Sequence, residues 1–228
     1  MGLFTSTPNY MEGDLSAQQA RKAVDYIRQI DDPARLADIA RDAKDSVVRA
    51  AAIRQLEDAV LLTEIAIADE SGKVGEICVR EKISDPVLLG RIALEARCGS
   101  VRLLAARHAY LNDQALLERI ALKDTDIAVR TAAVENTALN DPDALARIAT
   151  TARDEFLEPG WMAALKLSRR FPDRAAPMLI ELLKNEVAWK RVTPLNETLE
   201  FLSRYLRQTD DPSMKEAIES ILKRAGRL

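Results

Sequence analysis

A block of fixed internal spacing recurs five times in this chain of 228 residues. Each copy has an acidic residue, a Leu four positions later, an Ile-Ala pair seven and eight positions later, and a Val-Arg-like slot eight and nine positions after that Ala. The copies start 26 to 28 residues apart, so only the connection to the next copy varies in length. Repetition of this period is typical of stacked helical arrays. Copies one to five open at Asp32, Asp58, Asp85, Asp113 and Asp141.

Each copy is predicted to form two short helices. In copy one, Leu36, Ile39 and Val48 follow the 3.6-residue period of a helix and not the alternation of a strand. The composition agrees, because 47% of the residues are hydrophobic, only 4% are aromatic, and the chain has only 8 Gly and 9 Pro. We therefore expect an all-α fold in which helices of about ten residues are stable only when stacked on neighbours.

The opening acids are expected to cap the first helix of each copy. In Asp32-Pro33, Asp85-Pro86 and Asp141-Pro142 the acid takes the N-cap and Pro takes the first helical position, where its missing N–H costs nothing. The carboxylates of Asp45 and Asp126 are expected to cap second helices in the same way. Before copy one, Ser16 and Gln19 form a plausible capping box for a helix that reaches about Ile30.

The succession of an Ile-Ala pair, a short acidic linker, Val-Arg and a small-residue helix resembles the HEAT-like repeats, and at this length it is most similar to the leucine-rich repeat variant. The resemblance covers Asp32 to about Glu158. It implies an α-solenoid, a right-handed superhelix of about six two-helix repeats with helical caps. Second helices of such arrays line a concave face that commonly binds proteins.

The chain is expected to be one continuous domain with three parts. Residues 1–14 read as a flexible tail, residues 15–158 as the repeat array with its N-terminal capping helix, and residues 159–228 as a divergent repeat with C-terminal capping helices. In the last part, Pro159-Gly160-Trp161 is expected to start a helix that reaches about Phe171. Two further helices are expected from Pro194 to about Arg207 and from Asp211-Pro212 to Arg224.

Several residues that could carry chemistry fall in structural slots of the repeat. Cys78 occupies a small-residue slot that holds Ala in other copies, and His108, the single histidine, occupies a polar slot. Gly75 and Glu158 replace Arg in copies two and five, so any ladder of buried acid–Arg contacts is interrupted there. No phosphate-binding loop or metal-binding motif is present, and no cofactor is predicted.

Charge and hydropathy narrow the expected partners and location. The net charge of −3 argues against a surface devoted to nucleic acid. No apolar run approaches 18 residues and no secretory leader is visible, so we expect a cytoplasmic protein without a membrane span. The start of the chain, with Gly2 and Ser6, fits the N-myristoylation pattern, and lipidation stays an open alternative.

Two rows of charged residues are the best candidates for a binding surface. One, the arginine row, lies five positions after the Arg slot and holds Arg54, Arg80 and Arg107. The other, the charge row, lies six positions after the opening acid and holds Asp38, Glu64, Arg91, Arg119 and Arg147. Arg binds carboxylate and phosphate bidentately, so either row could dock an acidic or phosphorylated segment. The alternative is a solvated face with local ion pairs.

The leading functional prediction is a non-enzymatic module that binds a protein or peptide partner, including an acidic one. A second possibility, by analogy with HEAT-like enzymes, is a DNA glycosylase-like or lyase-like activity in the C-terminal section. A third is a structural subunit of a larger assembly, and the oligomeric state is left open. The cleft of the enzyme alternative would comprise Glu155, Glu158, Trp161, Trp189, Lys190 and Arg191, although the aromatic residues could instead seal the apolar end of the stack.

Overall fold

A computed structural model describes residues 15–151, 157–184, 189–190 and 192–228. Within these residues the secondary structure is helical and contains no strand, which confirms the predicted all-α fold. The chain divides into two compact units, which we call unit 1, ending at Leu111, and unit 2, beginning at Asn112.

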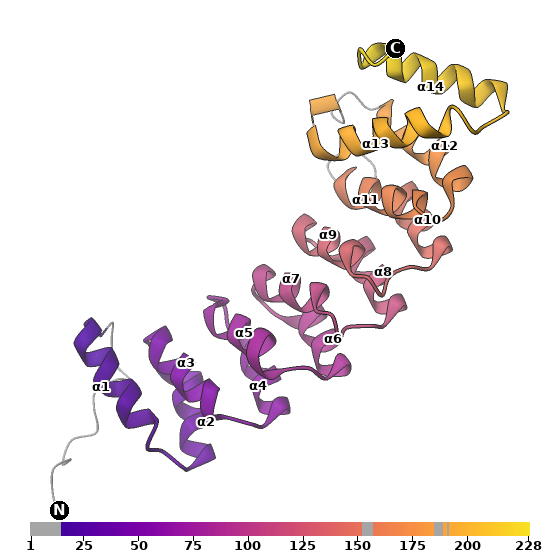
Figure 1. Ribbon diagram of the computed structural model, residues 1–228. Helices are drawn as coiled ribbons and strands as arrows, with labels where there is room; N and C mark the ends of the chain where they lie inside the picture. The colour runs from indigo at the N-terminus through magenta and orange to yellow at the C-terminus, as the bar shows by residue number, and fades with distance from the viewer. Residues whose placement is uncertain (1–14, 152–156, 185–188, 191) are drawn as a thin grey trace, which may run out of the picture. The chain divides into compact units, whose positions relative to one another are not determined.

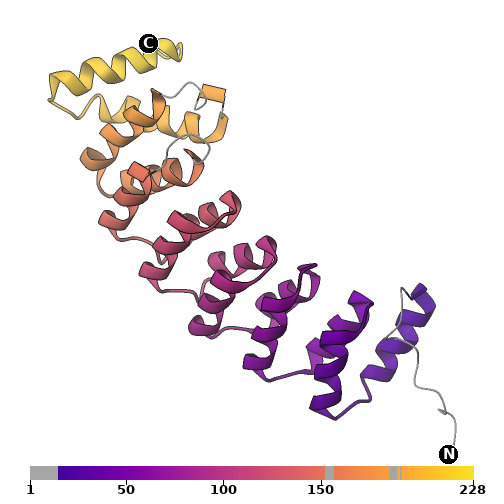
Figure 2. The ribbon, with the colours of Figure 1, turned by 180° about the vertical axis from the view of Figure 1, so that it is seen from behind.

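Unit 1 contains three copies of the repeat behind an N-terminal helix. In each copy the first helix packs on the second, and first helices also pack on one another: α2 on α4 and α4 on α6. Figures 1 and 2 show α2, α4 and α6 side by side, with α3, α5 and α7 in a second row. The elements are α1 Ala17–Ile27, α2 Pro33–Asp42, α3 Ser46–Gln55, α4 Ala59–Ala68, α5 Lys73–Ile77, the π-helical turn η1 Cys78–Lys82, α6 Pro86–Glu95 and α7 Gly99–Arg107.

Unit 2 continues the pairing through α8 with α9 and α10 with α11. Beyond them α12 packs on α11, and both α13 and α14 pack on α12. The helices are α8 Gln114–Lys123, α9 Ile127–Glu135, α10 Pro142–Thr151, α11 Leu157–Ser168, α12 Pro172–Leu183, α13 Val192–Tyr205 and α14 Pro212–Arg224.

The slots defined by the repeat form the core. Leu36, Ile39 and Val48 of copy one are buried, and so are the residues in the same slots of copies two to four and the Leu and Ile of copy five. The small-residue slot is fully buried at Ala52, Cys78, Ala105 and Ala133, where little space separates adjacent helices. Each buried Leu or Ile contributes about 1.5–3 kcal/mol, so most of the stability of these short helices comes from stacking.

The predicted caps are present. Asp32, Asp58, Asp85 and Asp113 each accept a hydrogen bond from a main-chain N–H in the first turn of the helix that follows. Asp45 and Asp126 do the same for the second helices α3 and α9, and the capping box of Ser16 and Gln19 opens α1. These contacts satisfy amide groups that have no partner within the helix.

Arginines of the Arg slot donate hydrogen bonds to main-chain carbonyls at the C-terminal ends of the first helices. Nη1 of Arg49 donates to the carbonyls of Ala43 (2.7 Å) and Lys44 (2.8 Å), and Nη1 of Arg102 donates to that of Ala96 (3.0 Å). These are carbonyls that the helix itself leaves unbonded. A ladder of acid–Arg contacts would give these arginines acidic partners. The bonds described here go to main-chain carbonyls instead.

In copy two the second helix runs from Lys73 to Lys82 and changes at Cys78 from α-helical (α5) to π-helical (η1) hydrogen bonding. Gly72 is the N-cap of α5 at φ +75°, a left-handed conformation that favours glycine. A Cβ at Gly75 would lie 2.8 Å from Cγ2 of Val101 and 3.1 Å from the carbonyl oxygen of Ala66, so an Arg does not fit there. Instead Asp69 Oδ2 accepts hydrogen bonds from the N–H groups of Val74 (2.8 Å) and Gly75 (2.9 Å).

Two predicted boundaries differ from the structure. The helix expected to begin at Pro159 begins at Leu157, so the predicted limit between residues 158 and 159 falls inside the first turn of α11. Proline is tolerated in a first turn because its position needs no donor there. Likewise α13 begins at Val192, before Pro194. The predicted N-terminal tail, residues 1–14, lies outside the described residues.

Candidate functional site

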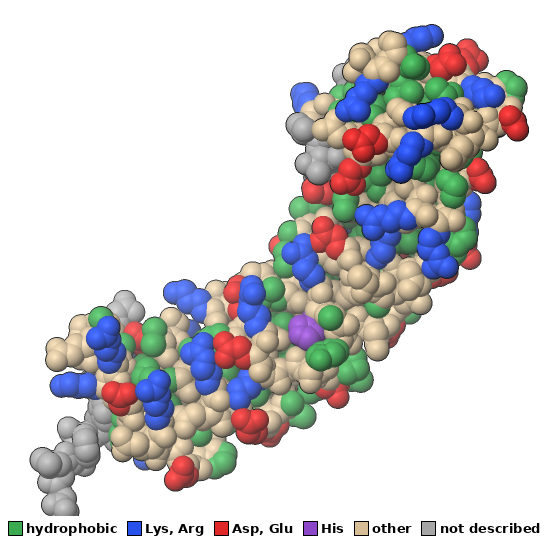
Figure 3. Space-filling view, viewed as in Figure 1, with side chains coloured by type: hydrophobic (Ala, Val, Ile, Leu, Met, Phe, Trp, Pro, Cys, Tyr) green, Lys and Arg blue, Asp and Glu red, His purple; other side chains and the backbone are tan. Residues whose placement is uncertain are grey.

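The arginine row is exposed but is not a row of three free guanidinium groups. Arg54 in α3 donates from Nε to Oε2 of Glu81 (3.1 Å) and from Nη2 to Oε1 (3.2 Å), which ties copy one to copy two. Arg80 in η1 is exposed and forms no ion pair with any other described residue, while Arg107 ends α7. On the face shown in Figure 3, basic side chains over α1 to α7 are interspersed with acidic ones.

The charge row also ties neighbouring copies together. In unit 1, Arg91 Nη1 lies 2.5 Å from Oε1 of Glu64, and its Nε lies 3.2 Å from Oε2 of Glu95. In unit 2, Arg147 makes a bidentate pair with Glu118 at 2.6 and 2.9 Å. The hydrogen bond to Glu118 raises the pKa of Arg147. Local ion pairs, the alternative for both rows, therefore describe Arg54, Arg91 and Arg147, whereas the exposed Asp38 and Arg119 form no ion pair within the described residues.

Trp161, the main aromatic residue of the predicted C-terminal cleft, does not line an open cleft. Trp161 is fully buried and donates from Nε1 to Oγ1 of Thr198 (2.6 Å), so it is a core residue between α11 and α13. Trp189 donates from Nε1 to the carbonyl of Leu183 (2.9 Å), and the Arg224 guanidinium lies 4.5 Å from its ring centroid. Both tryptophans thus stabilise packing at this end of unit 2.

The remaining residues of that cleft are scattered. Glu158 is half-buried in the first turn of α11, and Lys190 is exposed beside Trp189. Glu155 and Arg191 lie outside the described residues. The described residues therefore do not assemble the predicted set into one site.

The positions of Cys78 and His108 indicate packing roles and not catalytic ones. Cys78 is buried, and burial raises its pKa to about 12, so its thiol stays protonated and unreactive at neutral pH. Burial lowers the pKa of His108, whose Nδ1 accepts a hydrogen bond from the N–H of Tyr110 (3.3 Å). Among the residues described, no group of three His, Cys, Asp or Glu side chains could hold a metal ion. None of the described helices has the length and apolar character needed to cross a membrane.

Lys166 in α11 has a structural role that the repeat pattern does not indicate. Its Nζ donates to the carbonyls of Val134 (2.8 Å) and Asn136 (2.6 Å) at the end of α9. Burial, with the nearby charge of Arg169, lowers the pKa of Lys166 to about 8, although Glu135 opposes this shift. The ammonium group thus acts like the arginines of the Arg slot, because it bonds carbonyls at a helix end.

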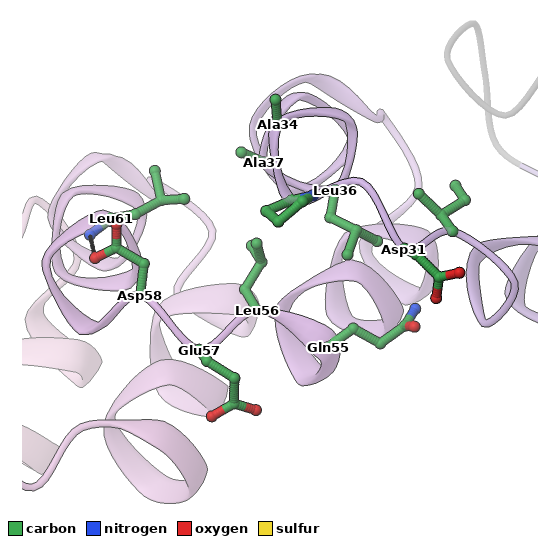
Figure 4. A pocket seen from close by; sticks show the side chains of 11 residues that line it. Asp31, Ala34, Leu36, Ala37, Gln55, Leu56, Glu57, Asp58 and Leu61 are labelled. Carbon is green, nitrogen blue, oxygen red and sulfur yellow. Dashed lines mark hydrogen bonds between the residues drawn. The ribbon is translucent and has the colours of Figure 1, made fainter.

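A groove between α2 and α4 in unit 1, with a volume of about 530 Å³, is a candidate binding site. In Figure 4, Ala37 on α2 points toward Leu61 on α4 across the gap, Ala34 lies one turn away at the same side, and Leu56 points into the gap from the connection before α4. Its lining comprises Ile30, Asp31, Pro33, Ala34, Leu36 and Ala37 from the first side and Gln55, Leu56, Glu57, Asp58 and Leu61 from the second.

Small residues in two slots of copy one account for this groove. The positions two and five after the opening acid hold Ala34 and Ala37, whereas copy two has Val60 and Thr63 there. The shorter side chains leave the space beside Leu61 unfilled. This signal is present in the sequence, but it appears only when the copies are compared slot by slot for size instead of for charge.

The edge of the groove is acidic, and Val60, next to the lining residue Leu61 in α4, is 57% exposed. Three acids, Asp31, Glu57 and Asp58, are part of the lining, which includes no Lys or Arg. The site can therefore accept apolar side chains between carboxylates.

Comparison of the chain with protein-family models, with curated proteins and with solved structures finds no match in any of the three. The functional argument consequently depends on the geometry of the chain itself.

Proposed function

We propose that the chain is an α-solenoid of HEAT-like repeats that acts as a non-enzymatic interaction module and binds a protein or peptide segment in the groove between α2 and α4. Packing within each unit supports the first part. Neighbouring copies pack on one another within each unit, α2 on α4 and α4 on α6 in unit 1 and α8 on α10 in unit 2, and the side chains of Arg54 and Arg147 bond acids one copy away. Arrays of this kind are built from nearest-neighbour contacts.

The groove is the observation that carries the binding part of the proposal. Its volume of about 530 Å³ is in the range of ligand-binding clefts, and its floor is made of Pro, Ala and Leu side chains. Protein interfaces concentrate their affinity in a few apolar anchors that fill such pockets. A partner that inserts an apolar side chain would cover the exposed Ala34 and the half-buried Leu61 above the buried Ala37.

The C-terminal enzyme alternative has less support. Its aromatic centre, Trp161, is fully buried and hydrogen-bonded to Thr198 within the core. A base-stacking surface needs an aromatic face open to the ligand. Trp189 remains, but Arg224 lies over its ring.

Filling the groove tests this function. A random library of dodecapeptides is selected on the immobilised full-length chain, and the Kd of each selected peptide is measured for wild type and for Ala34→Val. Ala34 is exposed, and Val occupies its slot at Val60 and Val87, so the variant should fold. Loss of the apolar anchor should weaken binding by about 10- to 100-fold.

Ala115→Val is the matched control, because Ala115 occupies the same slot in α8 and is also exposed. Binding to this variant should equal binding to wild type. Peptides that bind Ala34→Val as tightly as wild type, or a library that yields no binder, would rule out the groove as the partner site.

A further inference from the structure

We infer that the segment held by the groove is basic and amphipathic: apolar side chains enter the gap between α2 and α4, and Lys or Arg side chains beside them bond the carboxylates of Asp31, Glu57 and Asp58. The inference deepens the proposed function and depends on it. It also reverses the partner charge that the arginine row predicts.

The carboxylates around the groove have bonding capacity left. Asp31 is exposed and has no hydrogen bond or ion pair with other described residues. Glu57 uses Oε1 for Lys82 Nζ (3.0 Å), and 86% of its side chain is exposed. Asp58 uses Oδ1 for the N–H groups at the start of α4. A carboxylate accepts about four hydrogen bonds, so all three can accept more from a partner.

The basic groups of unit 1 near this edge neutralise only part of its negative charge. Lys82 bonds Glu57 with a side chain that is only 15% exposed, and it is not part of the lining. Arg35 follows Ala34 in α2, but its guanidinium bonds the hydroxyl of Tyr26 and lies 5.4 Å from that ring centroid. The opening of the groove therefore keeps an excess of negative charge.

An acidic residue directly before the capping acid occurs in copies one and two but not in copy three. Asp31 and Glu57 precede the capping acids of α2 and α4, whereas the same position holds Ser84 before α6. The small residues that open the gap occur in the same copy as Asp31. An apolar floor with charges on the surrounding edge is the usual division between affinity and orientation at a binding surface.

Charge distinguishes this partner from the N-terminal tail of the chain. Residues 1–14 include the apolar Leu3 and Phe4 but carry Glu12 and Asp14 and no Lys or Arg. The tail thus lacks the cations that the edge would bind. A second copy is a different case, because the C-terminal segment contains Arg224, Arg227 and an exposed Leu228.

The first test uses the dodecapeptides selected above. They should be enriched in Lys and Arg next to large apolar residues. The double variant Asp31→Asn/Glu57→Gln keeps the shape of both side chains and should weaken the selected peptides by about tenfold at low ionic strength, and by less near 0.15 M salt. The double variant Asp38→Asn/Asp42→Asn removes the same charge from exposed positions of α2 outside the lining and should change binding less than about twofold.

Each outcome separates the two proposals. If Ala34→Val abolishes binding but Asp31→Asn/Glu57→Gln does not weaken it, the groove binds a partner and the basic character is overturned. If Ala34→Val has no effect, both proposals fall. Concentration-dependent dimers in light scattering that Ala34→Val disrupts would identify a second copy as the occupant and overturn an external basic partner.

Discussion

The second helix of copy two and the second helices on either side of it stabilise the same place in the repeat by opposite means. In α3 and α7, an arginine of the Arg slot donates to carbonyls at the end of the first helix. In copy two the slot holds Gly75, and the carboxylate of Asp69 accepts from amides at the start of α5. In copies one and three the second helix supplies the donor, an Arg side chain, whereas in copy two the end of the first helix supplies the acceptor, the Asp69 side chain. The junction between the two helices is hydrogen-bonded in both cases.

This comparison shows which property the array repeats. Burial at slots such as Val48, Val74 and Val101 is the same in all three copies, because stacking needs it. The polar side chain at the junction can change, provided that the exposed ends of the helices find partners. Copy two also gains room for Val101 of copy three to pack on Gly75.

The largest expected effect comes from giving Gly75 a side chain. Gly→Ala within a helix usually stabilises it by about 1 kcal/mol. Here the new Cβ would lie 2.8 Å from Val101 Cγ2 and 3.1 Å from the Ala66 carbonyl oxygen, so Gly75→Ala should lower the free energy of unfolding by about 1–3 kcal/mol. Urea denaturation followed by circular dichroism measures it.

Arg102→Ala is the companion variant in copy three. It removes the bond to the Ala96 carbonyl without a steric clash and should cost about 1 kcal/mol. A Gly75→Ala protein more stable than wild type would mean that the close approach of copies two and three does not require glycine.

A smaller effect, dependent on pH, is expected at Asp69. Burial opposes ionisation of this carboxyl, but hydrogen bonds from Gly75, Ser71 and Val74 outweigh it and lower the pKa below the ordinary value of 3.8. A lowered pKa means that the ionised group stabilises the fold above about pH 4 and loses this contribution as pH falls through the folded pKa. Asp69→Asn should therefore cost about 1 kcal/mol at pH 7.

The difference in unfolding free energy between wild type and Asp69→Asn should shrink as pH falls below about 4. Asp42→Asn, an exposed position at the end of α2, controls for general charge effects. A difference that stays constant down to about pH 2 would show that the carboxylate charge is not what holds the start of α5.

The smallest effect is expected for the ion pair that joins α3 to η1. The side chains of Arg54 and Glu81 are 53% and 44% exposed, so solvent screens their attraction. A double-mutant cycle with Arg54→Ala and Glu81→Ala should give a coupling energy of about 0.2–1 kcal/mol. A coupling energy well above this range would show that the ion pair contributes more to the stability of the contact between copies one and two than its solvent exposure indicates.

The features that the sequence predicts best are those decided within one copy. Capping by Asp32 or Asp126 needs only the acid and the helix that follows it, and the final helix has the predicted limits at Pro212 and Arg224. The core slots follow from helical periodicity in the same way. Local rules were sufficient for these features.

Features that depend on two copies were harder to predict. The pair of Arg54 with Glu81 joins residues 27 positions apart in different slots, so a row drawn through one slot does not contain it. The close approach of Gly75 to Val101 involves copy three, and the hydrogen bond of buried Trp161 involves Thr198 of α13. The groove likewise depends on the size of Ala34 relative to Leu61 in the next copy.

The groove between α2 and α4 has an evolutionary consequence. Alanine and valine codons differ by a single base, so one point mutation at codon 34 exchanges the open slot of copy one for the filled slot of copy two. The caps and the core of the copy would stay as they are. A single substitution in one copy is therefore enough to open or fill such a groove while the caps and core slots of that copy are kept.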